Sequence, residues 1–231
     1  MQSYTYLLID IGCILVPFAA SFYPKHRFFN DWKPFFIANG IVGLFFLLWD
    51  AYFTSKGIWG FNADYLTGLY IFNLPLEEVL FFVCIPYACV FTYFALKYLA
   101  EKNPLGRYQR ILTIILIFVL LGLGVLYSDR WYTGMTFLLT ATYLIFRLIR
   151  RTNLAYHYLA YFLILPFFFI SNGILTGSLL DAPIVWYNDE EIIGIRLFTI
   201  PVEDTIYGLL LIVLNIDLYE FLRKRFLLQQ S

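Results

Sequence analysis

The sequence has little charge. Only 14% of its 231 residues are Asp, Glu, Lys or Arg, whereas soluble domains carry about a quarter. The 16 basic and 16 acidic residues cancel, and no basic domain stands out, so the chain lacks the electrostatic footprint of a nucleic-acid-binding protein. Hydrophobic residues make up 61% of the chain and aromatic residues 21%. A soluble fold could not bury that much apolar surface, and the composition predicts a membrane protein.

Cysteine and histidine are also scarce. The three cysteines lie inside apolar runs, and the two histidines, His26 and His157, are far apart near basic residues. None of them has the spacing of a zinc site or a disulfide framework. Gly122 and Gly124 lack the third glycine and the preceding strand of a dinucleotide-binding loop. We therefore expect no metal and no redox cofactor.

Seven apolar runs are near the length of about 20 residues that a helix needs to cross the hydrocarbon core of a membrane. They occupy residues 4–23, 34–54, 75–99, 111–127, 131–150, 154–177 and 199–222. The first run has neither the basic stretch nor the cleavage pattern of a signal peptide, so we expect it to be retained. The predicted fold class is an all-α integral membrane protein with seven transmembrane helices.

The basic residues predict the orientation, because loops on the cytoplasmic side of a membrane retain positive charge. Of the 16 Lys and Arg, all but Lys56, Arg130 and Arg196 lie at the end of the first, third, fifth or seventh run or in the segment that follows it. We expect a protein of the bacterial plasma membrane with its amino terminus outside and its carboxyl terminus in the cytoplasm. The two long connections, 55–74 and 178–198, then lie on the outer side, where their aromatic residues favour the membrane interface.

The sequence also repeats itself, and the segment from Asp50 to Phe82 recurs from Asn172 to Gly208. Pro75-Leu76-Glu77-Glu78 matches Pro201-Val202-Glu203-Asp204. Because corresponding helices are four apart in the chain, they cross in the same direction, and the two three-helix repeats are parallel. We expect a first repeat at 1–110, a linking helix at 111–130 and a second repeat at 131–231.

Each repeat places two acids in the first turn of an apolar helix, directly after a proline. These acids are Glu77 and Glu78, then Glu203 and Asp204. Their interaction with the helix dipole is worth about 0.3–1 kcal/mol each, whereas an acid at the membrane centre costs about 2.5–3.5 kcal/mol on insertion scales. The dipole does not offset that cost, so all four are candidate catalytic residues, and burial favours their neutral form.

A neutral carboxylic acid in an aromatic pocket without water can protonate an olefin, and its neighbour can take a proton back. Aromatic faces stabilise the carbocation that forms. The candidates for this role lie three to five positions beyond the acids and are Phe81, Phe82 and Tyr207. Weaker candidates, either as hydrogen-bond partners of the acids or as helix caps, are Asp50, Asn172, Asn62 and Asn188.

Two segments, Pro-Leu-Glu-Glu-Val-Leu-Phe-Phe at 75–82 and Pro-Val-Glu-Asp-Thr-Ile-Tyr-Gly at 201–208, carry a resemblance. Over essentially its whole length the chain resembles the membrane lycopene cyclases of the heterodimer type, in their fused single-chain form. The resemblance implies closure of the linear end groups of lycopene into β-ionone rings, a redox-neutral isomerisation of carotenoid biosynthesis that needs no flavin. It also implies a carotenoid substrate taken from the membrane lipid. A homo-oligomer is a further expectation left open.

Other classes of membrane protein fit less well. A retinal protein needs a Schiff-base lysine within its last helix, and the run 199–222 has none. A polyprenyl transferase needs aspartate-rich magnesium sites, and no Asp-x-x-Asp or Asp-x-x-x-Asp cluster lies in the apolar runs. A proton-coupled transporter stays the alternative, since intramembrane acids and parallel repeats also suit it. A nonenzymatic subunit is a further alternative, but a cyclase explains the aromatic residues near the acids better than either.

Overall fold

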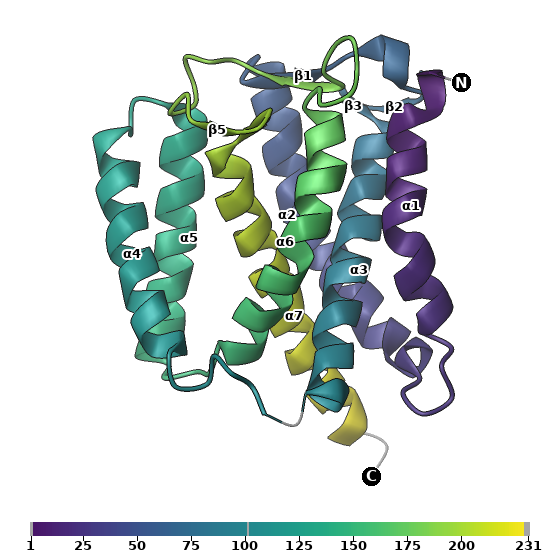
Figure 1. The fold of residues 1–231 in the computed structure, drawn as a ribbon, viewed down its shortest axis with the longest axis vertical. Helices are drawn as coiled ribbons and strands as arrows, with labels where there is room; N and C mark the ends of the chain where they lie inside the picture. The colour runs from purple at the N-terminus through teal and green to yellow at the C-terminus, as the bar shows by residue number, and fades with distance from the viewer. Residues whose placement is uncertain (1, 101, 229–231) are drawn as a thin grey trace. The chain divides into compact units, whose positions relative to one another are not determined.

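The protein was analysed as a computed structural model, which describes residues 2–100 and 102–228. Within these residues, seven helices are long and apolar enough to cross a membrane (Figure 1). They are α1 (Thr5–Ala20), α2 (Trp32–Ser55), α3 (Leu76–Leu99), α4 (Gln109–Leu126), α5 (Trp131–Ile149), α6 (Ala155–Leu175) and α7 (Val202–Leu228). The prediction of an all-α membrane protein with seven transmembrane helices is confirmed.

The helix bounds lie within a few residues of the predicted runs, with the largest difference in α7. The apolar run predicted a helix over 199–222, whereas α7 begins at Val202 and continues to Leu228. It begins later because Ile200–Pro201 form a strand. It ends later because Arg223 and Lys224 fall outside an apolar window although both are good helix formers.

Short strands fill the two long connections in the same order. The first connection contains β1 (Trp59–Phe61), β2 (Tyr70–Ile71) and β3 (Leu74–Pro75), and the second contains β4 (Val185–Tyr187), β5 (Arg196–Leu197) and β6 (Ile200–Pro201). β2 and β3 form an antiparallel hairpin, as do β5 and β6, and β1 pairs with β4. Each hairpin ends at the proline that precedes an acid-bearing helix, so the hairpins fix where α3 and α7 begin.

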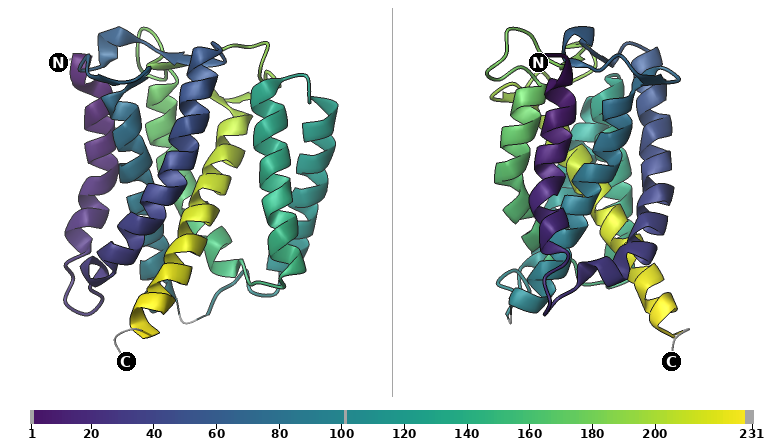
Figure 2. Two further views of the ribbon diagram at one scale, coloured as in Figure 1. Left: turned by 180° about the vertical axis from the view of Figure 1, so that it is seen from behind. Right: turned by 90° about the vertical axis from the view of Figure 1, so that its right-hand side faces the viewer.

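The chain divides into two compact units. The first contains residues up to Lys56, residues 61–100 and residues 211–228, and the second contains residues 57–60 and 102–210. In the first unit α3 packs against both α1 and α2, and in the second α4 packs against α5 (Figure 2). Helix α7 begins in the second unit and ends in the first, so the units are not the same as the sequence repeats.

The carboxyl-terminal part of α7 is bonded to the rest of the first unit. Asn39 on α2 donates a hydrogen bond of 3.2 Å to Asn215. Asp31, just before α2, accepts one of 3.2 Å from the hydroxyl group of Tyr219 and forms an ion pair of 3.0 Å with Arg223. Figure 1 shows the beginning of α1 and the end of α7 at opposite ends of this unit.

Candidate active site

The first pair of acids lies in the first turn of α3, and both side chains are buried. Oε1 of Glu77 accepts a hydrogen bond of 2.6 Å from the backbone N–H of Thr67. Oε2 of Glu78 accepts one of 2.5 Å from the hydroxyl group of Tyr6 on α1. The other oxygen of Glu77, Oε2, is buried and has no hydrogen-bond partner. We term Tyr6, Glu77 and Glu78 the first half-site.

The second pair lies in the first turn of α7 and is also buried. Oε1 of Glu203 accepts hydrogen bonds from the backbone N–H of Ile193 at 2.7 Å and from the hydroxyl group of Thr133 at 2.6 Å. Its other oxygen, Oε2, is buried without a hydrogen-bond partner, like that of Glu77. We term Tyr132, Glu203 and Asp204 the second half-site.

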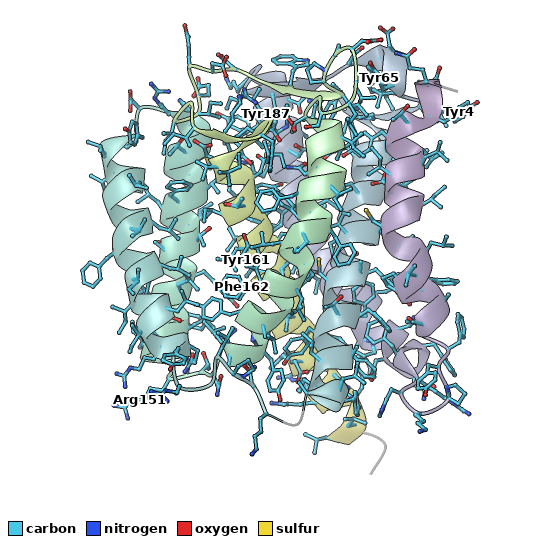
Figure 3. All side chains as sticks on the ribbon, viewed as in Figure 1. Tyr4, Tyr65, Arg151, Tyr161, Phe162 and Tyr187 are labelled. Carbon is cyan, nitrogen blue, oxygen red and sulfur yellow. The ribbon has the colours of Figure 1, made fainter. Side chains whose placement is uncertain are left out.

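Asp204 is held by three side-chain donors. Tyr132 donates a hydrogen bond of 2.6 Å to Oδ1. Oδ2 accepts one of 2.7 Å from the side-chain amide of Asn172 and one of 2.9 Å from the hydroxyl group of Tyr187, which lies in the loop that covers the start of α7 (Figure 3). Asn172 is thus a hydrogen-bond partner of Asp204, and its role in the site stays a prediction.

The two half-sites are built alike. The same spacing along the chain separates Tyr6 from Tyr132 and Glu77 from Glu203, and it also separates Thr67 from Ile193, whose N–H groups bind the two glutamates. Helix α1 thus corresponds to α5, and α3 to α7. Two hydrogen bonds to the acids are therefore repeated in the same register.

An aromatic cluster lies beside Asp204 in the second unit. Tyr132 and Tyr187, which both bond to Asp204, stack with their ring centroids 5.8 Å apart. Trp59 contacts Tyr132 edge-on at 5.0 Å, and Tyr207 contacts it edge-on at 6.2 Å. Tyr207, a predicted cation-stabilising residue, is therefore part of a cluster whose ring faces can stabilise positive charge.

The aromatic candidates of the first unit divide into two kinds. Phe81 lies edge-on to Tyr6, with ring centroids 6.5 Å apart, and so borders the first half-site. Phe82 is buried and stacks on Phe46 of α2 at 6.1 Å, which is a packing contact of the helix core. Phe81 thus contacts a residue of the first half-site, whereas Phe82 packs against α2.

The remaining candidates have different surroundings. Asp50 is buried on α2 and interacts electrostatically with Tyr6, so it belongs near the first half-site. Asn62 and Asn188 each accept a backbone hydrogen bond within their own loops, from the N–H groups of Asp64 at 3.1 Å and Glu190 at 3.0 Å. Asn62 caps the short 3₁₀ helix Ala63–Tyr65, which is the helix-cap role that the sequence also allowed, and Asn188 accepts the equivalent hydrogen bond in its own loop.

Sequence reasoning missed the site residues on α1 and α5. Tyr6, Tyr132 and Thr133 donate hydrogen bonds to the acids, and none of them stands out from its apolar run. The repeat register could have found the two tyrosines, because they are spaced as Glu77 and Glu203 are. Asp10, the lone acid of the first run, also carried a signal, because an ionisable residue within a membrane helix is by default a functional candidate.

The arrangement suits proton transfer. Within residues 2–100 and 102–228, no group of three or more His, Cys, Asp or Glu side chains is placed to hold a metal ion. Each half-site instead joins two adjacent carboxyl groups, one of which has an unpaired oxygen, to a tyrosine hydroxyl group and nearby aromatic rings. Such a site can give a proton to an apolar substrate and take one back.

The fold and the two half-sites define an integral membrane protein with a duplicated three-helix repeat and a buried acidic pair in each copy. The sequence model of the lycopene cyclase family matches residues 3–96 and, a second time, residues 129–222, so the chain belongs to the lycopene cyclase family. The two matches cover most of α1 to α3 and most of α5 to α7 in one chain, as in a fused single-chain cyclase. Searches of curated proteins and of solved structures gave no match.

Proposed function

We propose that this protein converts the linear end groups of lycopene into β-ionone rings, as an isomerase of carotenoid biosynthesis in the bacterial plasma membrane. Lycopene would enter from the lipid, which suits a fold with seven apolar helices. The amino terminus faces out, and both half-sites lie toward the outer side of the membrane. No metal or redox cofactor takes part, because the reaction only moves protons and carbon–carbon bonds.

The observation that carries this proposal is the burial and the hydrogen bonding of the Glu77 and Glu203 side chains. Both are fully buried, both have one oxygen held by a loop N–H group, and both have a second oxygen without a hydrogen-bond partner. A buried carboxylate with an unpaired oxygen would be costly, whereas a neutral acid can place its O–H group at that oxygen. Glu77 and Glu203 are therefore the proposed proton donors.

The reaction begins when the O–H bond of a glutamic acid breaks and a C–H bond forms at the terminal double bond of lycopene. A carboxylate and a tertiary carbocation result. A second double bond of the chain attacks the cation and closes the ring. A neighbouring carboxylate, Glu78 or Asp204, then removes a proton from the ring, and the electron pair of that C–H bond becomes the ring double bond. One proton enters and one leaves, and no electrons are gained or lost.

The test is expression of the full chain in bacteria that accumulate lycopene, followed by chromatography and mass spectrometry of the pigment. The expected product is a cyclic carotene with the same mass as lycopene. Unchanged lycopene in cells whose membranes contain the protein would refute the proposal and favour the transporter. A product that differs from lycopene by hydrogen atoms would indicate redox chemistry instead.

A further inference from the structure

Asp10 on α1 is a fully buried acid with a relative exposure of 0%. Neither of its carboxyl oxygens has a hydrogen-bond partner. This arrangement destabilises the folded protein, because a carboxyl group that is removed from water without a hydrogen-bond partner loses its solvation. No hydrogen bond that could stabilise the fold compensates for that loss, so the role of Asp10 lies elsewhere.

The neighbours of Asp10 are the acids of the first half-site. Helix α1 packs on α3, and Asp10 lies one turn beyond Tyr6, whose hydroxyl group binds Glu78. The carboxyl group of Asp10 interacts electrostatically with Glu78 and Glu77. Cys84, two turns beyond Glu77 on α3, also interacts electrostatically with Asp10. Asp10 therefore lies near the two glutamates, where α1 packs on α3.

The second repeat has no acid at this place. Thr136 is spaced from Asp10 as Tyr132 is from Tyr6, and it is buried, with a hydroxyl group that has no hydrogen-bond partner. Asp50 likewise corresponds to Asn172, which donates to Asp204. The first repeat therefore gathers four carboxyl groups where the second has two. Four buried acids in one site cannot all ionise, so some of them must hold protons.

We propose that Asp10 shares its proton with the acids of the first half-site and so acts on the reaction through Glu77 and Glu78. When a glutamic acid gives its proton to the substrate, the O–H bond of Asp10 breaks and its proton bonds to the new carboxylate. The negative charge is then shared among the carboxyl groups of this site. The proton released at ring closure returns to this group of acids, so the group ends each turnover as it began. Asp10 is a positioning residue in this scheme, and the inference rests on the proposed cyclase activity.

The decisive variant is Asp10→Asn, which keeps the size and the hydrogen-bonding capacity of the side chain but has no transferable proton. Asp10→Glu restores that proton, and Thr136→Val is the matched control in the second repeat. Each protein would be purified, reconstituted in lipid vesicles and assayed with lycopene at increasing concentration. Thermal unfolding of each variant in detergent would be measured alongside.

Asp10→Asn should lower the rate at saturating lycopene by about 10- to 100-fold, less than the 10² to 10⁴-fold expected for loss of a direct proton donor. The half-saturating lycopene concentration should not change. Asp10→Glu should recover most of the rate, and Thr136→Val should have the wild-type rate. The unfolding temperature of Asp10→Asn should equal or exceed that of the wild type, because a buried acid without partners is removed.

Two results would overturn the inference while the cyclase activity stands. One is a wild-type rate for Asp10→Asn in an assay where Glu77→Gln is inactive. The other is a loss of rate in both Asp10→Asn and Asp10→Glu that runs parallel to a lower unfolding temperature, which would make Asp10 a structural residue. A wild-type protein that leaves lycopene unchanged in the same vesicles would instead refute the proposed function, and the role of Asp10 with it.

Discussion

Glu77 and Glu203 accept the same loop hydrogen bond in the two repeats. Each directs one oxygen to a backbone N–H group of the loop that precedes its helix, Thr67 at 2.6 Å and Ile193 at 2.7 Å. The loop thereby fixes the carboxyl group, and the second oxygen of each is left unpaired in the protein interior. A helix-dipole role alone would not require burial of both oxygens, so the geometry favours a chemical role for the pair.

Replacement of either glutamate by glutamine should abolish most of the activity. Glu77→Gln and Glu203→Gln keep the shape and the acceptor for the loop N–H group but remove the transferable proton, and loss of a general acid typically costs 10² to 10⁴-fold in rate. Pigment conversion in lycopene-accumulating bacteria would measure the effect. Leu76→Ala is the control, and all variants must reach wild-type levels in the membrane. Near-normal conversion by both glutamine variants would make the helix-dipole role the better explanation.

The Tyr6–Glu78 hydrogen bond should be detectable as a coupling free energy in a double-mutant cycle of protein unfolding. Tyr6→Phe and Glu78→Gln each disturb a buried hydrogen bond of 2.5 Å, so the double variant should be more stable than the sum of the two losses predicts, by about 0.5–3 kcal/mol. Unfolding of the four proteins in detergent gives this coupling free energy. Tyr161→Phe, which loses a bond to the carbonyl oxygen of Thr205 instead, should show no coupling with Glu78→Gln. Strict additivity for Tyr6 and Glu78 would contradict the structure.

The contact between β1 and β4 should be sensitive to a single methyl group. A Cβ atom on Gly60 would lie 2.7 Å from Cε2 of Trp186 and closer still to Cζ2, so Gly60→Ala should destabilise the protein by about 1–3 kcal/mol through overpacking. Gly122→Ala is the matched control, because no atom lies within 4 Å of a Cβ at that helical position. That control should be neutral or more stable by up to about 1 kcal/mol. Equal unfolding temperatures for the two variants would show that Trp186 can move aside.

The topology prediction can be tested with reporter fusions. A reporter after Lys102, after Arg150 or at the carboxyl terminus should be cytoplasmic, because all but three of the 16 basic residues lie on that side. Reporters inserted in 55–74 and 178–198 should be on the outer side. A periplasmic signal from any of the first three would reverse the orientation and move both half-sites to the cytoplasmic side.

The sequence predicted those features that leave a pattern in the chain. Long apolar runs identify membrane helices, and an acidic pair after proline is unusual enough to be recognised twice, so the seven helices and the four acids could be found. The partners of the acids could not, because side-chain contacts between α1 and α3 depend on which face each helix turns inward. Helix α1 is apolar nearly all round, and periodicity does not distinguish its faces. Tyr6 is therefore indistinguishable from the other members of its apolar run, whereas Asp10 differs only as the lone acid.

The two asparagines show the opposite difficulty. Asn62 and Asn188 recur in the repeat, which suggested contact with the acids, but recurrence also follows from a repeated turn. Both side chains close the same short turn in their loops. The sequence cannot separate a residue repeated for its chemistry from one repeated for its backbone. The end of α7 beyond residue 222 was missed for a simpler reason, since hydropathy ends where the charged residues begin.

The bonds of α7 within the first unit have a consequence for biosynthesis. A ribosome delivers α1, α2 and α3 to the membrane long before residues 211–228 emerge, yet Asn215, Tyr219 and Arg223 belong to the packing of that first unit. Until they arrive, Asp31 lacks both of these partners. The first three helices of the nascent chain must therefore remain inserted but incompletely packed until the end of α7 has been synthesised.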